Sequence, residues 1–146
     1  MNATCVVAGV DGSEESRQAL RWAFEYAQMS NAPVEAVIAW EIPPNYGWLP
    51  SYDDVDFEKQ AQEILEEAIR DALGENAAVL RRVGRGHPAK VLVAASEHAR
   101  LLVVGSRGHG AFAGMLIGSV SQHLVQHAHC PVLVIRGHGR YARPGH

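Results

Sequence analysis

One stretch, residues 101–135, constrains the fold of this chain more than any other. It begins with a short apolar run, continues through a glycine-rich segment and a helical pattern, and closes on a second apolar run after Pro131. Short apolar runs of this kind are typical of buried parallel strands, and parallel strands need a crossover such as a helix between them. The stretch therefore predicts a strand, loop, helix and strand in succession, which is one unit of an α/β fold.

The loop of this unit has the composition of a phosphate-binding site. Its glycines are Gly105, Gly108, Gly110, Gly114 and Gly118. Glycine lets a ligand approach the main chain, and helix N-terminal amides carry the positive end of the helix dipole. Ser119 and Ser121 can cap the helix or donate hydroxyls to phosphate oxygens. The region 105–131 contains Arg107 but no acidic residue, so a polyanion would meet no like charge there. A flexible surface loop before an ordinary capped helix is the alternative.

The same alternation of strand and helix extends over the whole chain. Apolar runs predict strands at 5–10, 34–40, 77–83, 101–104 and 132–135. Helical patterns begin after Ser13 and Asp56, at Pro88 and at Ser119. The second helix has an apolar stripe made of Phe57, Ala61, Ile64, Leu65, Ala68 and Ala72. This order predicts a single-domain, Rossmann-like α/β fold: an open five-stranded parallel sheet with helices on both faces. We expect the domain to span residues 1–136 and residues 137–146 to form a flexible tail.

Asp11 is a second candidate site residue because of its place after a strand. In open parallel sheets, ligands bind beyond the carboxyl ends of the strands, where the strand order reverses. Asp11 follows the first predicted strand and Gly105 follows the fourth. If these strands are neighbours, both residues face one crevice, and Asp11 could bind ribose hydroxyls or a metal ion attached to phosphate. A turn-forming aspartate is the alternative role.

Composition and charge restrict the partners and the compartment. A net charge of −3 and a pI near 6.2 do not indicate the basic face that nucleic acid requires. No apolar run approaches the roughly 20 residues that span a bilayer, and the N-terminus lacks the basic segment of a signal peptide. Cys5 and Cys130 are interpreted as free thiols of a reducing compartment. We therefore expect a cytoplasmic protein that binds neither nucleic acid nor membrane.

Two other phosphate motifs match less well. A P-loop requires Gly-Lys followed by Ser or Thr, and the sequence contains neither combination. A dinucleotide fingerprint is matched in part at 108–113, GHGAFA, but the acid expected about 20 residues later is missing. The glycine loop also has no lysine and no carboxylate that could orient an attacking water. Binding is therefore better supported than turnover.

Histidines invite a metal hypothesis near the C-terminus. His123 and His127 are four residues apart, with His129 and Cys130 just beyond, and this spacing can hold zinc. On a helical wheel, however, both histidines lie at the solvent edge of the buried stripe. We therefore interpret both histidines as residues at the boundary of the buried face, and not as metal ligands.

Nucleophilic catalysis is not indicated either, because the sequence contains no G-x-S-x-G motif.

The glycine spacing resembles the signature of the universal stress protein family. Gly105 and Gly108 are separated by two residues, and nine more precede Gly118-Ser119, which matches G-2x-G-9x-G-[S/T]. Two further segments are similar to that family, VVAGVDGS at 6–13 and CPV at 130–132. The resemblance covers about residues 4–136.

The resemblance implies an ATP site, because the complete signature marks the ATP-binding group of the family. The implied cofactor-binding residues are Gly9, Val10, Asp11, Ala39, Trp40, Val104, Gly105, Arg107, Gly108, Gly118, Ser119, Val120 and Ser121. Those from the glycine loop and the following helix would meet phosphates and ribose. Those at the ends of the first two strands, together with Asp11, would meet adenine and ribose, with Asp11 on the ribose or on Mg²⁺. Arg107 occupies a variable position, and its role is inferred from charge alone.

The resemblance also implies a homodimer and a regulatory role. The family commonly dimerises through its last strand, here Val132, Leu133, Val134 and Ile135. An uncovered apolar edge would otherwise be a liability. Our leading interpretation is a nucleotide-responsive stress regulator that binds ATP with Mg²⁺. A slow Mg²⁺-dependent ATPase or adenylyl-transfer enzyme, a cyclic AMP-binding protein and a nucleotide-free dimeric interaction module remain open.

Overall fold

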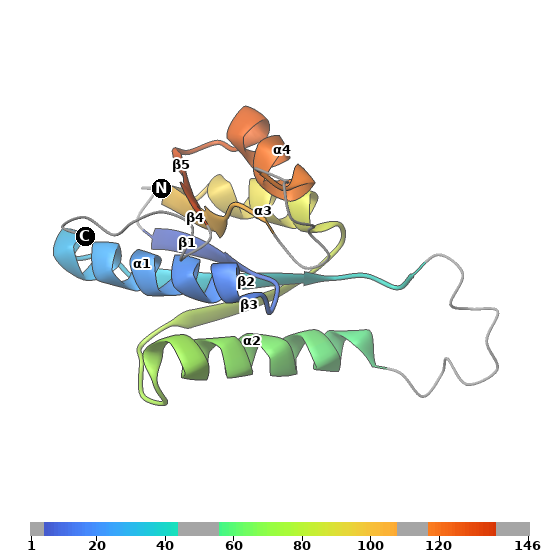
Figure 1. The fold of residues 1–146 in the computed structure, drawn as a ribbon, viewed down its shortest axis with the longest axis horizontal. Coiled ribbons are helices and arrows are strands. Elements are labelled where there is room, and N and C mark those ends of the chain that lie inside the picture. The colour runs from blue at the N-terminus through green and yellow to red at the C-terminus, as the bar shows by residue number, and fades with distance from the viewer. Residues whose placement is uncertain (1–4, 44–55, 108–116, 137–146) are drawn as a thin grey trace.

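The computed structural model describes residues 5–43, 56–107 and 117–136, and the statements below concern these residues. Strands and helices alternate along them (Figure 1). The strands are β1 (Cys5–Val10), β2 (Val34–Trp40), β3 (Leu80–Arg85), β4 (Ala99–Gly105) and β5 (Val132–Ile135). The helices are α1 (Glu14–Ser30), α2 (Phe57–Leu73), α3 (Pro88–Ser96) and α4 (Ser119–His127). The predicted flexible tail at 137–146 lies outside the described residues.

The strands in the described part of the chain form one parallel sheet in the order β3-β2-β1-β4-β5. This confirms the predicted five-stranded Rossmann-like sheet. From β1 the chain proceeds to β2 and β3 on one side, and it then returns to place β4 and β5 on the other. β1 and β4 are therefore neighbours, with Val6 opposite Leu101 and Ala8 opposite Val103. The strand order reverses between them, which is where sheets of this type bind ligands.

Helices cover both faces of the sheet, with α1 and α2 on one face and α3 and α4 on the other (Figure 1). Alternate residues of a strand point to opposite faces. Val6 and Ala8 of β1 therefore belong to the α1–α2 core, whereas Val7 belongs to the α3–α4 core. The side of α1 that meets the sheet includes the buried small residues Ala19, Ala23 and Ala27. These small side chains let α1 lie close to the strands.

The helices α1, α2 and α3 begin next to the residues that the sequence indicates. Ser13 is the N-cap of α1 and accepts a hydrogen bond from the amide of Ser16 at 3.2 Å. Asp56 caps α2 through the amide of Lys59 at 3.0 Å, and His87, just before Pro88, caps α3 by accepting from the amide of Ala89 at 3.1 Å. These side chains satisfy amides that have no partner within their own helix. The start of α1 is thereby set directly after Asp11, next to the end of β1.

The boundaries of two strands differ from the prediction. β3 begins at residue 80 and not at 77, and β4 spans 99–105 and not 101–104. β3 is an edge strand, and its arginines form ion pairs with carboxylates, Arg81 with Glu66 at 2.6 Å and Arg82 with Glu35 at 3.1 Å. Charged side chains at an edge reach solvent and discourage further strand pairing. Pairing with β2 rather than local hydrophobicity therefore decides where β3 begins and ends.

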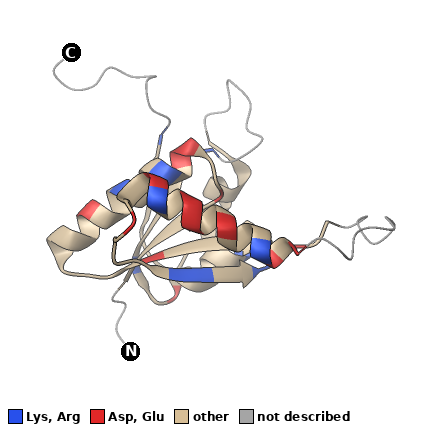
Figure 2. Cartoon of the chain, turned by 90° about the horizontal axis from the view of Figure 1, so that it is seen from below, with Lys and Arg blue, Asp and Glu red and all other residues tan. Residues whose placement is uncertain are grey.

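The stripe predicted for α2 is partly wrong. The buried residues of this helix are Ala61, Leu65, Ala68 and Ile69, whereas Ile64 is 40% exposed. The prediction included Ile64, which lines a cavity, and missed Ile69, which belongs to the core. On its outer face, α2 carries interspersed acidic and basic positions, and β3 carries basic ones (Figure 2). None of the helices in the described residues is long and apolar enough to cross a membrane.

Candidate functional site

A cavity of about 630 Å³ lies at the carboxyl ends of β1, β2 and β4. Every predicted site residue that the structure describes lines it: Gly9, Val10, Asp11, Ala39, Trp40, Val104, Gly105, Arg107, Gly118, Ser119, Val120 and Ser121. Gly108, which was also predicted, lies outside the described residues. These residues meet because β1 and β4 are neighbours, as the prediction required. The volume is in the range of ordinary small-molecule sites.

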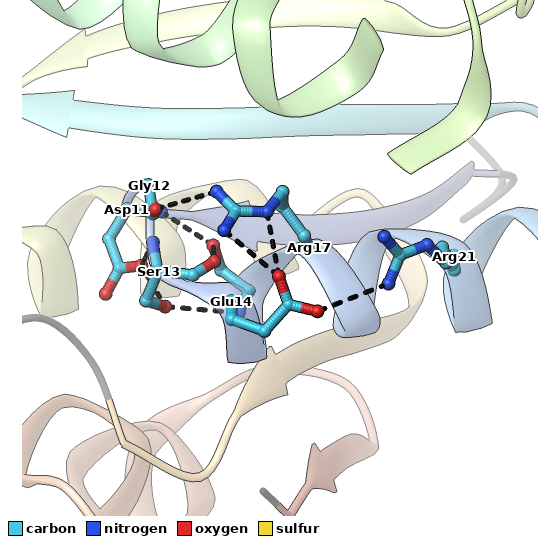
Figure 3. Close-up of polar contacts among 7 residues, drawn as sticks. Asp11, Gly12, Ser13, Glu14, Arg17 and Arg21 are labelled. Atoms are coloured by element: carbon cyan, nitrogen blue, oxygen red, sulfur yellow. Dashed lines mark hydrogen bonds and ion pairs between the residues drawn. The ribbon is translucent and has the colours of Figure 1, made fainter. Parts of the chain in front are cut away.

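Asp11 forms the turn between β1 and α1 (Figure 3). Its Oδ1 accepts hydrogen bonds from the amide and the hydroxyl of Ser13, at 2.9 and 2.6 Å. Gly12 has a φ of 86°, in the left-handed region that favours glycine. The amide of Asp11 donates to Oγ of Ser16 at 3.3 Å. Asp11 therefore has the turn-forming role, and this turn also places it at the cavity wall.

An ion-pair cluster supports the same turn from outside the cavity (Figure 3). Glu14 pairs with Arg17 at 3.0 Å and with Arg21 at 3.7 Å, and Arg17 donates to the carbonyl of Gly12 at 2.9 Å. Burial alone would raise the pKa of Glu14, but the hydrogen bond and charge of Arg17, together with Arg21, lower it below its usual value. Among the described residues that line the cavity, none belongs to this cluster.

The N-terminus of α4 borders the cavity. Gly118 is the N-cap of this helix, and its amide donates to the carbonyl of Ser106. Ser119, which we considered as a cap, is instead the first helical residue and is exposed. The first amides of a helix have no intrahelical acceptor and carry the positive end of the dipole. The residues that supply them here, Ser119 to Ser121, line the cavity, so this wall is suited to an anion.

Ser121 has a structural role that the sequence did not reveal. Its side chain is buried, with 4% of the residue exposed, and its hydroxyl donates to the carbonyl of Gly105. This hydrogen bond ties the end of β4 to the first turn of α4. Of the two serines expected to offer hydroxyls to phosphate, Ser119 is the one whose side chain is exposed.

Glu15 is a residue of this region that sequence reasoning missed. Its Oε1 accepts hydrogen bonds from the amide of Arg107 at 2.7 Å and from the hydroxyl of Ser106 at 3.0 Å. Its Oε2 lies 3.2 Å from Nη2 and 3.3 Å from Nε of Arg107. The expectation that a polyanion would meet no like charge there is therefore wrong, because the carboxylate comes from α1. No feature within residues 105–131 could have indicated it.

The other end of the cavity is largely apolar. The lining residues that were not predicted are Ser13, Ser16, Val37, Ile38, Glu41, Phe57, Gln60, Ala61, Ile64, Pro88 and Leu92. The α2 residues among them recur every three or four positions at the start of the helix, so they form one wall. This periodicity was visible in the sequence, but it was assigned to the core.

Trp40 is held firmly at this apolar end. Its carbonyl accepts a hydrogen bond from the amide of Gly86 at 2.8 Å, and Cζ of Arg85 lies 5.3 Å from the centroid of its indole ring. A guanidinium over an indole face is a favourable cation–π contact. The indole ring, with Arg85 against its face, is therefore part of the wall.

The histidines and cysteines lie elsewhere. His123 and His127 are exposed on α4, with ring centroids 4.4 Å apart. Within the described residues no group of three histidine, cysteine or acidic side chains is placed to hold a metal ion. Cys5 and Cys130 are both free thiols, and burial raises the pKa of each.

An open parallel sheet, a helix N-terminus at its switch point and an adjoining apolar wall together define an α/β protein with a cavity at the switch point of its sheet. The chain belongs to the universal stress protein family, whose family model matches residues 4–136. The resemblance inferred from the glycine spacing is thus confirmed at the level of the family.

Curated relatives and solved structures agree with this assignment. The chain is 41% identical over 133 residues to universal stress protein Rv2623 of Mycobacterium tuberculosis, an alignment that covers 90% of this chain and 44% of that protein. It is 32% identical over 141 residues to a universal stress protein of Mycolicibacterium smegmatis, covering 90% and 48%. The chain therefore spans about half the length of the curated relatives it matches.

The solved structures resemble nearly the whole fold. Universal stress protein UspA of Lactobacillus plantarum has a TM-score of 0.74 at 20% identity, covering 93% of this chain and 99% of that one. A universal stress protein in complex with cAMP has a TM-score of 0.68 at 28% identity, covering 90% and 96%. The Archaeoglobus fulgidus universal stress protein in complex with dAMP has a TM-score of 0.61 at 25% identity, covering 92% and 99%.

Proposed function

We propose that the cavity binds ATP, and that the protein is a nucleotide-responsive stress regulator. The observation that supports the proposal is the union, in one space of about 630 Å³, of an apolar wall and a helix N-terminus. A nucleotide base packs against an apolar wall, and phosphates bind the free amides of a helix N-terminus. The family relatives bound to cAMP and dAMP support adenine nucleotides as the ligand class.

The lining residues fit the parts of such a nucleotide in order. Adenine would lie between β2 and α2, against Trp40 and Ile64. Asp11, at the end of β1, would bind ribose hydroxyls. The amides of α4, the exposed hydroxyl of Ser119 and the guanidinium of Arg107 would receive the phosphates.

Magnesium would accompany the nucleotide. This ion is commonly held by one or two carboxylates together with substrate phosphates. Asp11 contributes a carboxylate residue to the cavity wall and so fits this chemistry. Slow Mg²⁺-dependent hydrolysis is the second candidate function, and Asp11 is the residue that favours it. Release of ADP that requires Mg²⁺ and is lost in Asp11→Asn would establish that activity.

The ligand is tested directly on the purified chain. We expect heat to release ATP from it, detected by ion-exchange chromatography, and calorimetry to show tighter binding of ATP than of adenosine. Gly118→Val should abolish binding, because Gly118 is buried, lines the cavity and is the N-cap of the helix whose amides would receive the phosphates. Val125→Ala, on an exposed part of the same helix, is the matched control and should bind normally. No copurified nucleotide and no heat of binding for ATP, AMP or cyclic AMP would refute the proposal.

We also propose that two copies pair through β5, and that the protein works in the cytoplasm. β5 is the last strand in the sheet order, and its residues are all partly exposed and aliphatic. Edge strands with such side chains readily accept another strand. The cytoplasmic location is inferred from the two free thiols.

A further inference from the structure

Glu15 joins α1 to the segment that follows β4. This contact lies at the anion end of the cavity, the end at which we propose that phosphates bind to α4 and Arg107. It lies in the first turn of α1, and its carboxylate binds three groups that follow β4: the hydroxyl of Ser106, the amide of Arg107 and the Arg107 guanidinium. Glu15 and Arg107 are separated by 92 positions in the sequence. The contact therefore exists only because β1 and β4 are adjacent.

The geometry leaves this pair little freedom. A Cβ at Gly105 would lie 2.8 Å from Cβ of Glu15, so the backbone of β4 is packed directly against α1. The side chains of Glu15 and Arg107 are 12% and 25% exposed. Arg107 lines the cavity, whereas Glu15 contacts Arg107 and is not among the lining residues. A carboxylate with so little access to water is weakly screened by salt.

We propose that Glu15 sets the preference of the site for the number of phosphates, because it neutralises Arg107. This inference rests on the proposed nucleotide function. A phosphate chain that approaches this ion pair is attracted by the Arg107 guanidinium and repelled by the Glu15 carboxylate. The repulsion cancels part of the attraction. Both terms increase with the charge of the ligand, so Glu15 moderates the advantage of ATP over AMP. Glu15 acts through Arg107 and is a positioning and charge-balancing residue.

The test uses Glu15→Gln in the full chain. Glutamine keeps the shape of glutamate, and its carbonyl oxygen can still accept from Ser106 and from the Arg107 amide. The charge is lost together with the hydrogen bonds from the Arg107 guanidinium to Oε2, because an amide nitrogen cannot accept them, and Arg107 becomes an uncompensated cation. We expect the affinity ratio of ATP to AMP, measured by calorimetry, to increase about tenfold, while adenosine affinity stays unchanged.

Glu14→Gln is the matched control. It removes the same charge one residue earlier in the same helical turn, but its partners are Arg17 and Arg21 outside the cavity (Figure 3). This variant should leave the ratio of ATP to AMP at the wild-type value. The double variant Glu15→Gln/Arg107→Gln should return the ratio close to that value, because both charges of the pair are gone.

A second variant, Arg107→Gln, tests the same inference if Glu15→Gln does not fold. Arg107→Gln leaves the carboxylate of Glu15 uncompensated, and we expect it to lower the ratio of ATP to AMP about tenfold. The inference is overturned if either folded variant binds ATP and AMP with the wild-type ratio. If the wild type binds ATP and AMP but the ratio never moves, only this inference fails. If the wild type binds no nucleotide, the proposed function fails with it.

Discussion

Two glycines control how closely the walls of the cavity approach each other. A Cβ on Gly105 would lie 2.8 Å from Cβ and 3.1 Å from the carbonyl carbon of Glu15, so it would collide with the helix itself. A Cβ on Gly9 would meet only the ends of side chains, at 3.0 Å from Leu92 and 3.1 Å from Val104. Side-chain ends can rotate away, but a helix backbone moves only with its whole element. Gly105 is therefore the more restricted position.

At the residue scale, we expect Gly105→Ala to destabilise the fold by about 1–3 kcal/mol, the usual effect of overpacking. Gly84→Ala is the control, because its Cβ would lie just as close, 2.8 Å, to a methyl group of Val91 and to no backbone atom within that range. Gly84→Ala should lower the free energy of unfolding clearly less than Gly105→Ala does. Urea unfolding followed by circular dichroism measures both. Equal losses would show that the α1 backbone is not the obstacle.

At the scale of elements, β4 and α4 are joined by their ends. The buried hydroxyl of Ser121 donates to the carbonyl of Gly105, and the amide of Gly118 donates to the carbonyl of Ser106. These hydrogen bonds hold the start of α4 beside the end of β4. Ser119, between them, leaves its side chain exposed at the cavity. The sequence suggested the same phosphate-binding role for both serines. In the structure the hydroxyl of Ser121 is used to join β4 to α4, whereas the side chain of Ser119 is exposed.

This difference predicts opposite effects for two substitutions in one turn. Ser121→Ala should lower the free energy of unfolding by about 1–2 kcal/mol, because it removes a buried hydrogen bond from the Gly105 carbonyl. Ser119→Ala should change it by less than about 0.5 kcal/mol, yet weaken ATP binding. Thermal unfolding and calorimetry on both variants separate the effects. Loss of stability in Ser119→Ala, with none in Ser121→Ala, would contradict the assignment.

At the scale of the whole molecule, the two edges of the sheet differ in character. β3 presents arginines in ion pairs, whereas β5 presents aliphatic side chains. The carbonyls of Pro131, just before β5, and of Ile135 accept hydrogen bonds from the amides of Leu102 and Ser106, so these carbonyls face the β4 side. Backbone groups alternate in direction along a strand, so those of Val134 face outward. A second copy of the chain can therefore pair with β5.

We expect the wild type to have twice the 15.8 kDa mass of one chain in light scattering. Val134→Pro removes only an outward amide, so it should yield a folded monomer, as proline is tolerated at edge strands. Leu133→Pro, the neighbouring control, removes a donor to β4 and should destabilise the fold itself. A wild-type monomer, or a Val134→Pro dimer, would exclude pairing through β5.

Much of the fold was predictable because its signals are local. The apolar runs of β1, β2 and β5, the cap at Ser13 and the proline that opens α3 all depend on neighbouring residues alone. The limits of β3 and the exposure of Ile64 were not predictable in this way. Both depend on what lies beside the element, namely β2 in the first case and the cavity in the second.

The sequence by itself determined the order of strands and helices, the family and the cavity-lining residues at the ends of β1, β2 and β4 and at the start of α4, since periodicity and glycine spacing are properties of the chain. Only the tertiary structure decided that Glu15 balances Arg107, that Ser121 is committed to Gly105 and that α2 forms a wall. These contacts join residues far apart in the chain. They arise from the reversal of strand order between β1 and β4, together with the packing of helices against both faces of the sheet.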